Sequence, residues 1–304
     1  MLRLAPQRSP LEALLLAPLL LAAACARPAA PPPPEAATSP GAPASAASLD
    51  ALVQSPRPTA ALAPVPTAPE PPPQPPALTA AEPFIELAVE GFAPAIVSLP
   101  RGARDKRPVV LATHGNYDRP EWQCEVWRGI VGDGAFILCP RGIARPDSPS
   151  ADDIRFTYAS NQALEREIDA GMVALRARFP EHVDAEHPLY TGFSLGAIMG
   201  VSIAARNPGR YLRMVLIEGG HDKWTPEAAK SFAAGGEARV LFVCSQPWCA
   251  SDARAAAGKL TRAGAATEVV RGPSVGHRYD GPIAEAAKEA LPWVVTGDAR
   301  WEPR

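Results

Sequence analysis

The chain has 304 residues, a formal net charge of −2 and charged residues at 20%. This near-neutral balance argues against nucleic acid or another polyanion as a partner, and a neutral small-molecule or polymer substrate fits it better. Of the 37 prolines, 21 lie at or before Pro83, so a core is expected only in the later part of the chain.

Residues 1–25 have the layout of a secretory signal peptide. Two arginines precede a run rich in Leu and Ala, from Leu11 to Ala24, which is too short to span a bilayer. The run from Leu21 to Cys25 resembles a bacterial lipobox, and this resemblance implies a lipid anchor on Cys25. We therefore expect an exported protein held at the cell envelope, on the outer membrane or the periplasmic face, or secreted if Cys25 carries no lipid.

Residues 26–82 are mostly Pro, Ala, Ser and Thr, with little charge and no periodicity. Such a composition buries too little apolar surface to offset its ordering entropy, and its prolines favour extended conformations. We interpret the segment as a disordered tether; a proline-rich ligand for a partner domain is the alternative. One globular domain is expected over 83–304.

The domain has the pattern of alternating strands and helices. Short apolar or alternating runs predict strands at 84–89, 95–99, 108–113, 135–139, 189–191, 214–217, 240–244 and 268–271. Apolar residues at helical spacing predict helices around 122–130, 162–179, 195–206, 251–263 and 283–294. The first two strands form a hairpin around Glu90-Gly91. The rest predict an α/β fold with a mainly parallel, doubly wound sheet, helices on both faces and a minimal or absent lid domain.

The pentapeptide Gly192-Phe193-Ser194-Leu195-Gly196 lies between a predicted strand and a predicted helix. This is the setting of a nucleophile elbow, in which two glycines allow a tight turn and the serine hydroxyl is exposed. The start of the helix directs N–H groups toward a developing oxyanion. Ser194 is therefore the expected nucleophile, and a glycine-rich turn that only packs is the alternative.

With this motif, the chain resembles the α/β-hydrolase family over nearly all of residues 84–296. His114-Gly115-Asn116 matches the oxyanion loop after the family's third strand, and Gly276-His277 matches its late catalytic histidine. The group that it most resembles includes dienelactone hydrolases, polyester depolymerases and prolyl-oligopeptidase-like domains. The resemblance implies that the backbone N–H groups of Leu195 and Asn116 form an oxyanion hole, and that His114 supports this loop structurally.

A histidine must accept the proton of Ser194 and later return it. His277 is favoured because it lies between the last strand and the last helix, whereas the competing His221 follows the strand immediately after the elbow. His114 is a weaker candidate for a metal ligand, since no Cys/His cluster has the spacing of a metal site. No metal and no cofactor are expected.

The acid of the triad has more than one candidate. In the family the acid follows the seventh strand, here 240–244, and Asp252 is the first carboxylate after that strand. Glu218 and Asp222, after the preceding strand, are alternatives of the displaced kind found in some relatives. The predicted acid is Asp252, and the two alternatives stay open.

The four cysteines other than Cys25 form an even set in a compartment that permits disulfides. Cys124 and Cys139 lie on adjacent predicted elements, and Cys244 and Cys249 are separated by only four residues. We predict these two disulfides; four reduced thiols in the core are the alternative.

These features predict a serine hydrolase that cleaves a carboxylic ester through an acyl-enzyme. A serine peptidase or amidase would use the same residues, and a non-catalytic binding lipoprotein would retain only the fold. Either an apolar substrate pocket or core packing accounts for four tryptophans near the strand ends: Trp122, Trp127, Trp224 and Trp248. The expected partners are a small-molecule or polymer ester and, through Cys25, a membrane.

Overall fold

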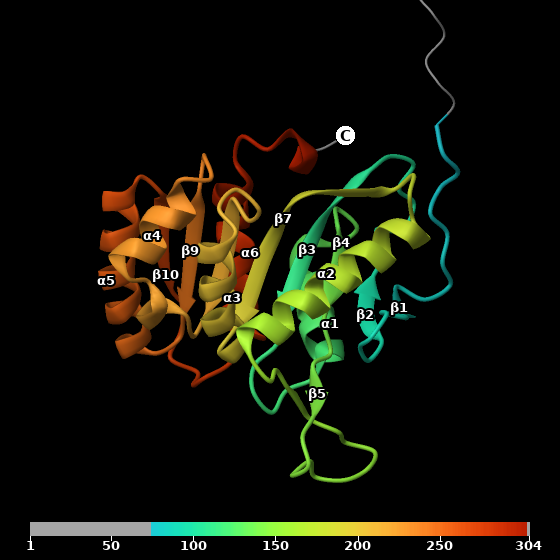
Figure 1. The fold of residues 1–304 in the computed structure, drawn as a ribbon, viewed down its shortest axis with the longest axis horizontal. Coiled ribbons are helices and arrows are strands. Elements are labelled where there is room, and N and C mark those ends of the chain that lie inside the picture. The colour runs from blue at the N-terminus through green and yellow to red at the C-terminus, as the bar shows by residue number, and fades with distance from the viewer. Residues whose placement is uncertain (1–73, 303–304) are drawn as a thin grey trace, which may run out of the picture. The chain divides into compact units, whose positions relative to one another are not determined.

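The computed structural model describes residues 74–302, which form an eight-stranded sheet between two layers of helices (Figure 1). The strands of this sheet are β1 (Phe84–Leu87), β2 (Ala95–Ser98), β3 (Arg107–Thr113), β4 (Phe136–Cys139), β7 (Val183–Phe193), β8 (Arg213–Ile217), β9 (Arg239–Cys244) and β10 (Ala266–Arg271). The helices are α1 (Pro120–Val131), α2 (Asn161–Arg178), α3 (Leu195–Arg206), α4 (Pro226–Ala233), α5 (Pro247–Ala263) and α6 (Pro282–Val295), with single 3-10 turns η1 (His221–Lys223) and η2 (Ala299–Trp301).

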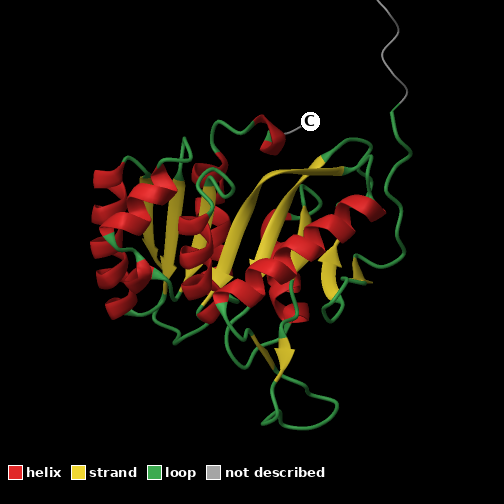
Figure 2. Ribbon diagram, viewed as in Figure 1, coloured by secondary structure: helices red, strands yellow, loops and turns green. Residues whose placement is uncertain are grey.

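The strand order is β1-β2-β4-β3-β7-β8-β9-β10. The pairs β1/β2 and β2/β4 are antiparallel, and every other neighbouring pair is parallel. This arrangement confirms the predicted mainly parallel, doubly wound sheet and its opening hairpin. The arrowheads of the parallel strands point to one edge, where the loops that follow them gather (Figure 2).

Both faces of the sheet are buried, which explains why its strands read as continuous apolar runs. Along β3, Val109 and Leu111 pack toward one helix layer, and Val110 and Ala112 pack toward the other. The first layer contains α2, α3, α4 and α5, and the second contains α1 and α6 (Figure 1).

An insertion of residues 140–160 joins β4 to α2 and contains a two-stranded hairpin, β5 (Ile143–Ala144) and β6 (Phe156–Thr157). It projects from the edge at which the parallel strands end (Figure 1). The β5/β6 hairpin was not predicted, because two-residue strands leave no periodic signal in the sequence. The insertion is small, in agreement with the expected minimal lid.

Two elements begin earlier than predicted. β7 starts at Val183, although Pro188 lies within it, and α5 starts at Pro247 rather than near residue 251. Proline at the first helical position is favourable because its missing N–H has no partner there in any case. The early start of α5 places Asp252 in the second turn of the helix rather than in its first.

The packed part of the chain begins before residue 83. Leu78 is buried in the core, and its N–H donates to the carbonyl oxygen of Ala103 at 2.8 Å. His182 Nε2 lies 3.0 Å from the carbonyl oxygen of Pro76. The predicted signal peptide, Cys25 and most of the predicted tether lie outside the described residues. Within 74–302 no helix is long and apolar enough to cross a membrane.

Both predicted disulfides are confirmed. Cys124–Cys139 joins α1 to β4, and Cys244–Cys249 joins the end of β9 to the first turn of α5. All four cysteines are fully or almost fully buried.

Candidate active site

Ser194 lies in a tight turn between β7 and α3. Its backbone adopts a φ of 49°, which is unfavourable for a residue with a side chain, and its N–H donates to the carbonyl oxygen of Ile217 at 3.0 Å. A Cβ atom at Gly192 would lie 2.5 Å from the backbone nitrogen of Ala197, and one at Gly196 would lie 2.5 Å from Thr113 Oγ1. Only glycine fits at these two positions, so the motif forms the predicted elbow.

His277 lies beside the serine. Its Nε2 is 2.9 Å from Ser194 Oγ, and its ring packs against Phe193 with centroids 4.8 Å apart. The loop between β10 and α6 carries it, as expected. The competing His221 is elsewhere: it is buried near the start of η1, and its ring meets the edge of Trp248.

Glu218 is the carboxylate that reaches this histidine. Its Oε2 is 3.4 Å from His277 Nδ1, and its side chain is 0% exposed. Glu218 Oε1 accepts the backbone N–H groups of Ser245 and Gln246, and Oε2 accepts Gln246 Nε2 at 3.1 Å. These three donors compensate the carboxylate for its loss of water and fix its orientation.

The structure does not bring the first-choice acid, Asp252, to the histidine. Its side chain is 59% exposed on α5, and its Oδ2 lies 4.0 Å from Nδ1 of His221. Asp222 is also remote from the histidine, since it is exposed and pairs with Lys223 at 2.7 Å. Asp252 is displaced because α5 begins at Pro247, within the loop that the Cys244–Cys249 disulfide closes, so that Asp252 lies on the helix. Glu218, one of the two alternatives, therefore takes the place of Asp252 as the candidate acid.

Two backbone amides next to Ser194 are free to bind an oxyanion. Within residues 74–302, the N–H groups of Leu195 and Asn116 donate to no other group. Asn116 follows Gly115, whose own N–H donates to Asp118 Oδ2 at 3.2 Å, and a Cβ atom at Gly115 would lie 3.5 Å from Ser194 Cβ. The loop after β3 thus passes directly beside the serine, as the sequence resemblance implied.

His114 is buried under this loop. Its ring stacks on Tyr158 with centroids 4.4 Å apart, and its two ring nitrogens face the carbonyl oxygens of Gly115 and Arg141 at 2.8 and 3.0 Å. Burial lowers the pKa of His114, and its hydrogen bonds to the carbonyl oxygens of Gly115 and Arg141 act in the opposite direction. These contacts suit a structural support. Among the described residues no group of His, Cys, Asp and Glu is arranged to hold a metal.

A buried hydrogen bond between Asp118 and Tyr279 joins the loop after β3 to the loop of His277. The Tyr279 hydroxyl donates to Asp118 Oδ1 at 3.1 Å, while Oδ2 of the same carboxylate accepts Gly115 N–H. Burial, with a further contribution from Asp118, raises the pKa of Tyr279, so the hydroxyl remains a donor. The sequence held no local signal for this bond, because its partners are 161 residues apart.

A pocket of about 630 Å³ opens beside His277, between the loop after β3, the start of α1 and the loop of His277. Trp122 lines it, together with Tyr117, Phe193 and Tyr279. Of the other three tryptophans near the strand ends, Trp127 and Trp224 are fully buried core residues, and Trp248 is exposed at the start of α5.

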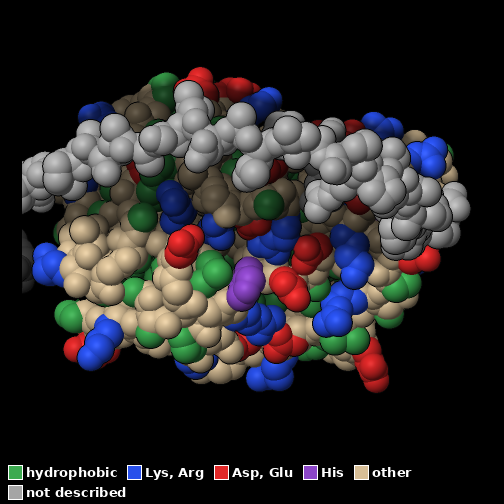
Figure 3. Space-filling view, turned by 90° about the horizontal axis from the view of Figure 1, so that it is seen from above, with side chains coloured by type: hydrophobic (Ala, Val, Ile, Leu, Met, Phe, Trp, Pro, Cys, Tyr) green, Lys and Arg blue, Asp and Glu red, His purple; other side chains and the backbone are tan. Residues whose placement is uncertain are grey.

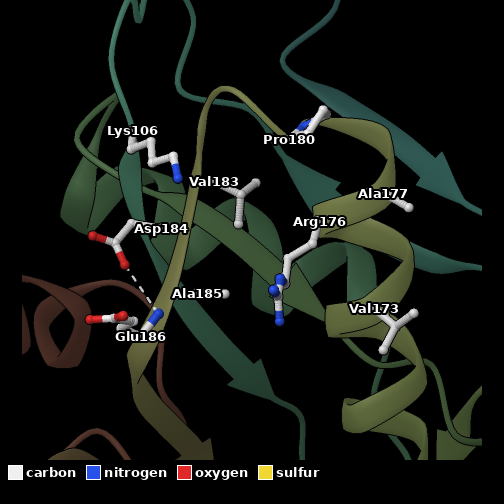
Figure 4. Close-up of a pocket in the computed structure, with 9 residues that line it drawn as sticks. All are labelled: Lys106, Val173, Arg176, Ala177, Pro180, Val183, Asp184, Ala185 and Glu186. Carbon is white, nitrogen blue, oxygen red and sulfur yellow. Dashed lines mark hydrogen bonds between the residues drawn. The ribbon is translucent and has the colours of Figure 1, made fainter.

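A larger hollow of about 790 Å³ lies between α2 and the start of β7. Its walls carry Lys106, Arg176, Asp184 and Glu186, and Asp184 Oδ1 accepts the N–H of Glu186 (Figure 4). Viewed from above, onto the amino ends of the strands, basic and acidic side chains are interspersed (Figure 3). No serine, cysteine or histidine lines this hollow, so we place the candidate chemistry at the opposite edge, around Ser194.

No protein-family model and no curated protein matches the sequence. Among solved structures, an uncharacterized protein from Bacillus cereus ATCC 10987 matches with a TM-score of 0.50 and 16% identity, over 63% of this chain and 60% of that chain. A carboxylesterase from Mesorhizobium loti matches with a TM-score of 0.49 and 21% identity, over 69% of this chain and 99% of that chain. A dienelactone hydrolase from Anabaena variabilis ATCC 29413 matches with a TM-score of 0.48 and 15% identity, over 70% of this chain and 95% of that chain. Such identities concern the fold alone, and the fold is a mainly parallel eight-stranded sheet with helices on both faces, as predicted.

Proposed function

We propose that the protein is a serine hydrolase that cleaves carboxylic esters through an acyl-enzyme. Ser194 is the nucleophile, His277 the general base and acid, and Glu218 the carboxylate that orients the histidine. One observation carries the proposal: a serine hydroxyl, an imidazole and a buried carboxylate lie in series, at 2.9 and 3.4 Å. Two backbone amides that donate to no other group within residues 74–302 adjoin the serine: that of Leu195, directly after it, and that of Asn116, in the loop beside it.

In the first half-reaction Ser194 Oγ attacks the ester carbonyl carbon and gives its proton to His277 Nε2. The carbonyl oxygen gains negative charge, which the N–H groups of Leu195 and Asn116 stabilise; one such donor is worth about 3 kcal/mol. The bond to the alcohol oxygen then breaks, and His277 returns the proton to that oxygen. A water molecule repeats the sequence on the acyl-enzyme and releases the acid and free Ser194.

Glu218 has an orienting role in this cycle. Its Oε2 accepts a hydrogen bond from Nδ1–H of His277, so the proton of the neutral ring stays on Nδ1 and the unprotonated Nε2 faces Ser194. When His277 becomes an imidazolium, the carboxylate stabilises its charge. The amides of Ser245 and Gln246 hold the carboxylate of Glu218 in place throughout the cycle.

A fluorophosphonate probe tests the proposal, because it reacts only with an activated serine. We expect wild-type protein to form one adduct, located by peptide mass on Ser194, and both heat-unfolded protein and the Ser194→Ala variant to form none. A folded wild-type protein without an adduct would point to a binding protein instead. Turnover of matched ester and amide substrates then separates the two hydrolase classes: faster amide cleavage contradicts the ester assignment.

We also propose that the protein is exported and anchored by a lipid on Cys25. Two disulfides among the described residues support an oxidising compartment. The anchor rests on the sequence from Leu21 to Cys25. In a host with two membranes, Cys25→Ala should move the protein from the membrane fraction to the soluble fraction and abolish metabolic labelling with an alkynyl fatty acid. An unchanged distribution and unchanged labelling contradict the anchor.

A further inference from the structure

The pocket beside His277 is placed to receive one particular part of an ester. One wall is formed by residues 277–280, and the facing wall by residues 116–118 and the start of α1. His277 must hand its proton to the departing alcohol, so the alcohol part of the substrate lies against this histidine. This placement rests on the proposed function. The pocket is therefore on the alcohol side of the ester.

Aromatic rings form much of the lining. Tyr117 and Trp122 are each 39% exposed, and Phe193 and Tyr279 contribute from deeper in the wall. The guanidinium of Arg155 lies 4.3 Å from the centre of the Trp122 ring and 5.7 Å from that of Tyr117. Such cation–π contacts hold both rings in place before a ligand arrives. A flat, apolar group fits a wall of this kind.

The charges of the lining disfavour an anion. The lining contains three acidic residues, Asp118, Glu125 and Asp280, and one arginine, Arg278. With His277 counted as neutral, its formal net charge is −2. Arg278 and Asp280 form a bidentate pair and neutralise each other. The remaining negative charge belongs to Asp118, which is buried, and Glu125, which is exposed and makes no side-chain hydrogen bond or ion pair with the other described residues.

Arginines behind the pocket do not reverse this balance, because each is paired. Arg145 forms two hydrogen bonds with Asp147, and Arg155 donates to Asp153 at 2.8 Å. Arg119 lies within 3.6 Å of Asp153 as well as near Glu121. A carboxylate on the alcohol would meet uncompensated negative charge and no free guanidinium.

We propose that this pocket binds the uncharged aromatic alcohol part of the ester and rejects alcohols that carry a carboxylate. Trp122 supplies the stacking surface, and Glu125 supplies the accessible part of the repulsion. Neither residue takes part in the proton transfers, so each governs which ester is cleaved rather than whether esters are cleaved.

Three acetate esters, with the acyl group held constant, test the proposal: ethyl acetate, benzyl acetate and 4-(acetoxymethyl)benzoate. We expect kcat/KM at low ionic strength to be highest for benzyl acetate and about tenfold or more lower for the carboxylate ester, with the gap narrowing as salt is added. Trp122→Ala should lower kcat/KM for benzyl acetate about tenfold and leave ethyl acetate nearly unchanged, and Trp122→Phe should restore most of the loss.

Charge and stacking are separated by a second pair of variants. Glu125→Gln should narrow the gap between benzyl acetate and the carboxylate ester about threefold, as expected for one partly exposed charge. Glu289→Gln is the matched control, because Glu289 is an exposed acid on α6 without a side-chain partner among the described residues. Glu289→Gln should leave the ratio of kcat/KM between benzyl acetate and the carboxylate ester unchanged.

The outcomes distinguish this proposal from the proposed function. If wild-type protein cleaves none of the three esters and forms no fluorophosphonate adduct, the proposed function fails. If it cleaves all three with similar kcat/KM, or if Trp122→Ala affects ethyl and benzyl acetate equally, the hydrolase stands and the pocket assignment is overturned. The pocket assignment is also overturned if Glu125→Gln leaves the difference in kcat/KM between benzyl acetate and the carboxylate ester unchanged.

Discussion

Replacing Glu218 by Gln is expected to lower kcat for ester hydrolysis by about 10⁴-fold while the fold stays intact. Glu218 offers two acceptor oxygens to four donors: the N–H groups of Ser245 and Gln246, the side-chain amide of Gln246, and Nδ1 of His277. Glutamine has one acceptor oxygen and one NH₂ group. Its NH₂ group must point either at the backbone amides, which are donors themselves, or at Nδ1 of His277. In the second case Nδ1 becomes the acceptor and the proton sits on Nε2, which then cannot accept the proton of Ser194.

Asp252→Asn is the matched control for this measurement. It also removes one carboxylate charge from the same edge of the sheet, but its side chain is exposed and lies against His221. We expect kcat close to that of wild type and an unchanged melting temperature. Loss of turnover in Asp252→Asn together with full turnover in Glu218→Gln would show that the acid has been misassigned. Circular dichroism of both variants verifies that they are folded.

Removing the two disulfides separately should give opposite rankings for stability and turnover. The chain-entropy contribution grows with the length of the closed loop, so Cys124–Cys139, with a separation of 15, contributes about 3 kcal/mol. Cys244–Cys249, with a separation of 5, contributes about 2 kcal/mol. The double variant Cys124→Ala/Cys139→Ala should therefore have the lower melting temperature.

Turnover should depend more on the Cys244–Cys249 disulfide than on Cys124–Cys139. Cys244 and Cys249 bracket Ser245 and Gln246, whose N–H groups hold Glu218. Without the disulfide these amides move more freely, and we expect Cys244→Ala/Cys249→Ala to lower kcat about tenfold or more, since small misplacements of catalytic groups are costly. Calorimetry and kcat for a small ester check both rankings. Equal losses of kcat in the two double variants would contradict the role of the Cys244–Cys249 loop.

Local patterns in the sequence were sufficient for the scaffold and the elbow. Buried strands such as 108–113 and 240–244 are apolar throughout, and Pro180 marks the end of α2, so periodicity and breaking residues placed most of the elements. Gly192 also acts locally, because a Cβ atom there would meet the backbone of Gly196 and Ala197, whereas Gly196 makes room for Thr113 of β3. Ser194 and His277, which the sequence predicted to be nucleophile and base, lie within hydrogen-bond distance of each other.

The acid was harder to predict because its place depends on where a neighbouring element begins. Asp252 is the first carboxylate after β9 in sequence, but α5 starts early and turns it away from the site. Glu218 follows β8 directly and is followed by Gly219, where a Cβ atom would lie 2.7 Å from the carbonyl oxygen of Ser194. That glycine is a signal of close approach to the elbow, and it favours Glu218 over Asp252.

The contacts between loops had no sequence signal at all. Asp118 and Tyr279 meet across the pocket although their own neighbourhoods predict only loops. The same holds for Arg155, which reaches Trp122 from an insertion that has almost no regular structure. Such contacts follow from the packing of whole loops, and single-sequence periodicity carries no information about it.

The position of Glu218 has a consequence for redesign. Ser194 and Glu218 follow the ends of two directly paired strands, where Phe193 is opposite Ile217, so the sheet itself sets their separation. The loop after β9 supplies backbone amides and one glutamine side chain instead of the orienting carboxylate. Exposed side chains in the first two turns of α5, such as Trp248 and Asp252, are thus free to be exchanged for substrate-binding groups, provided that the main-chain path from Cys244 to Cys249 is kept.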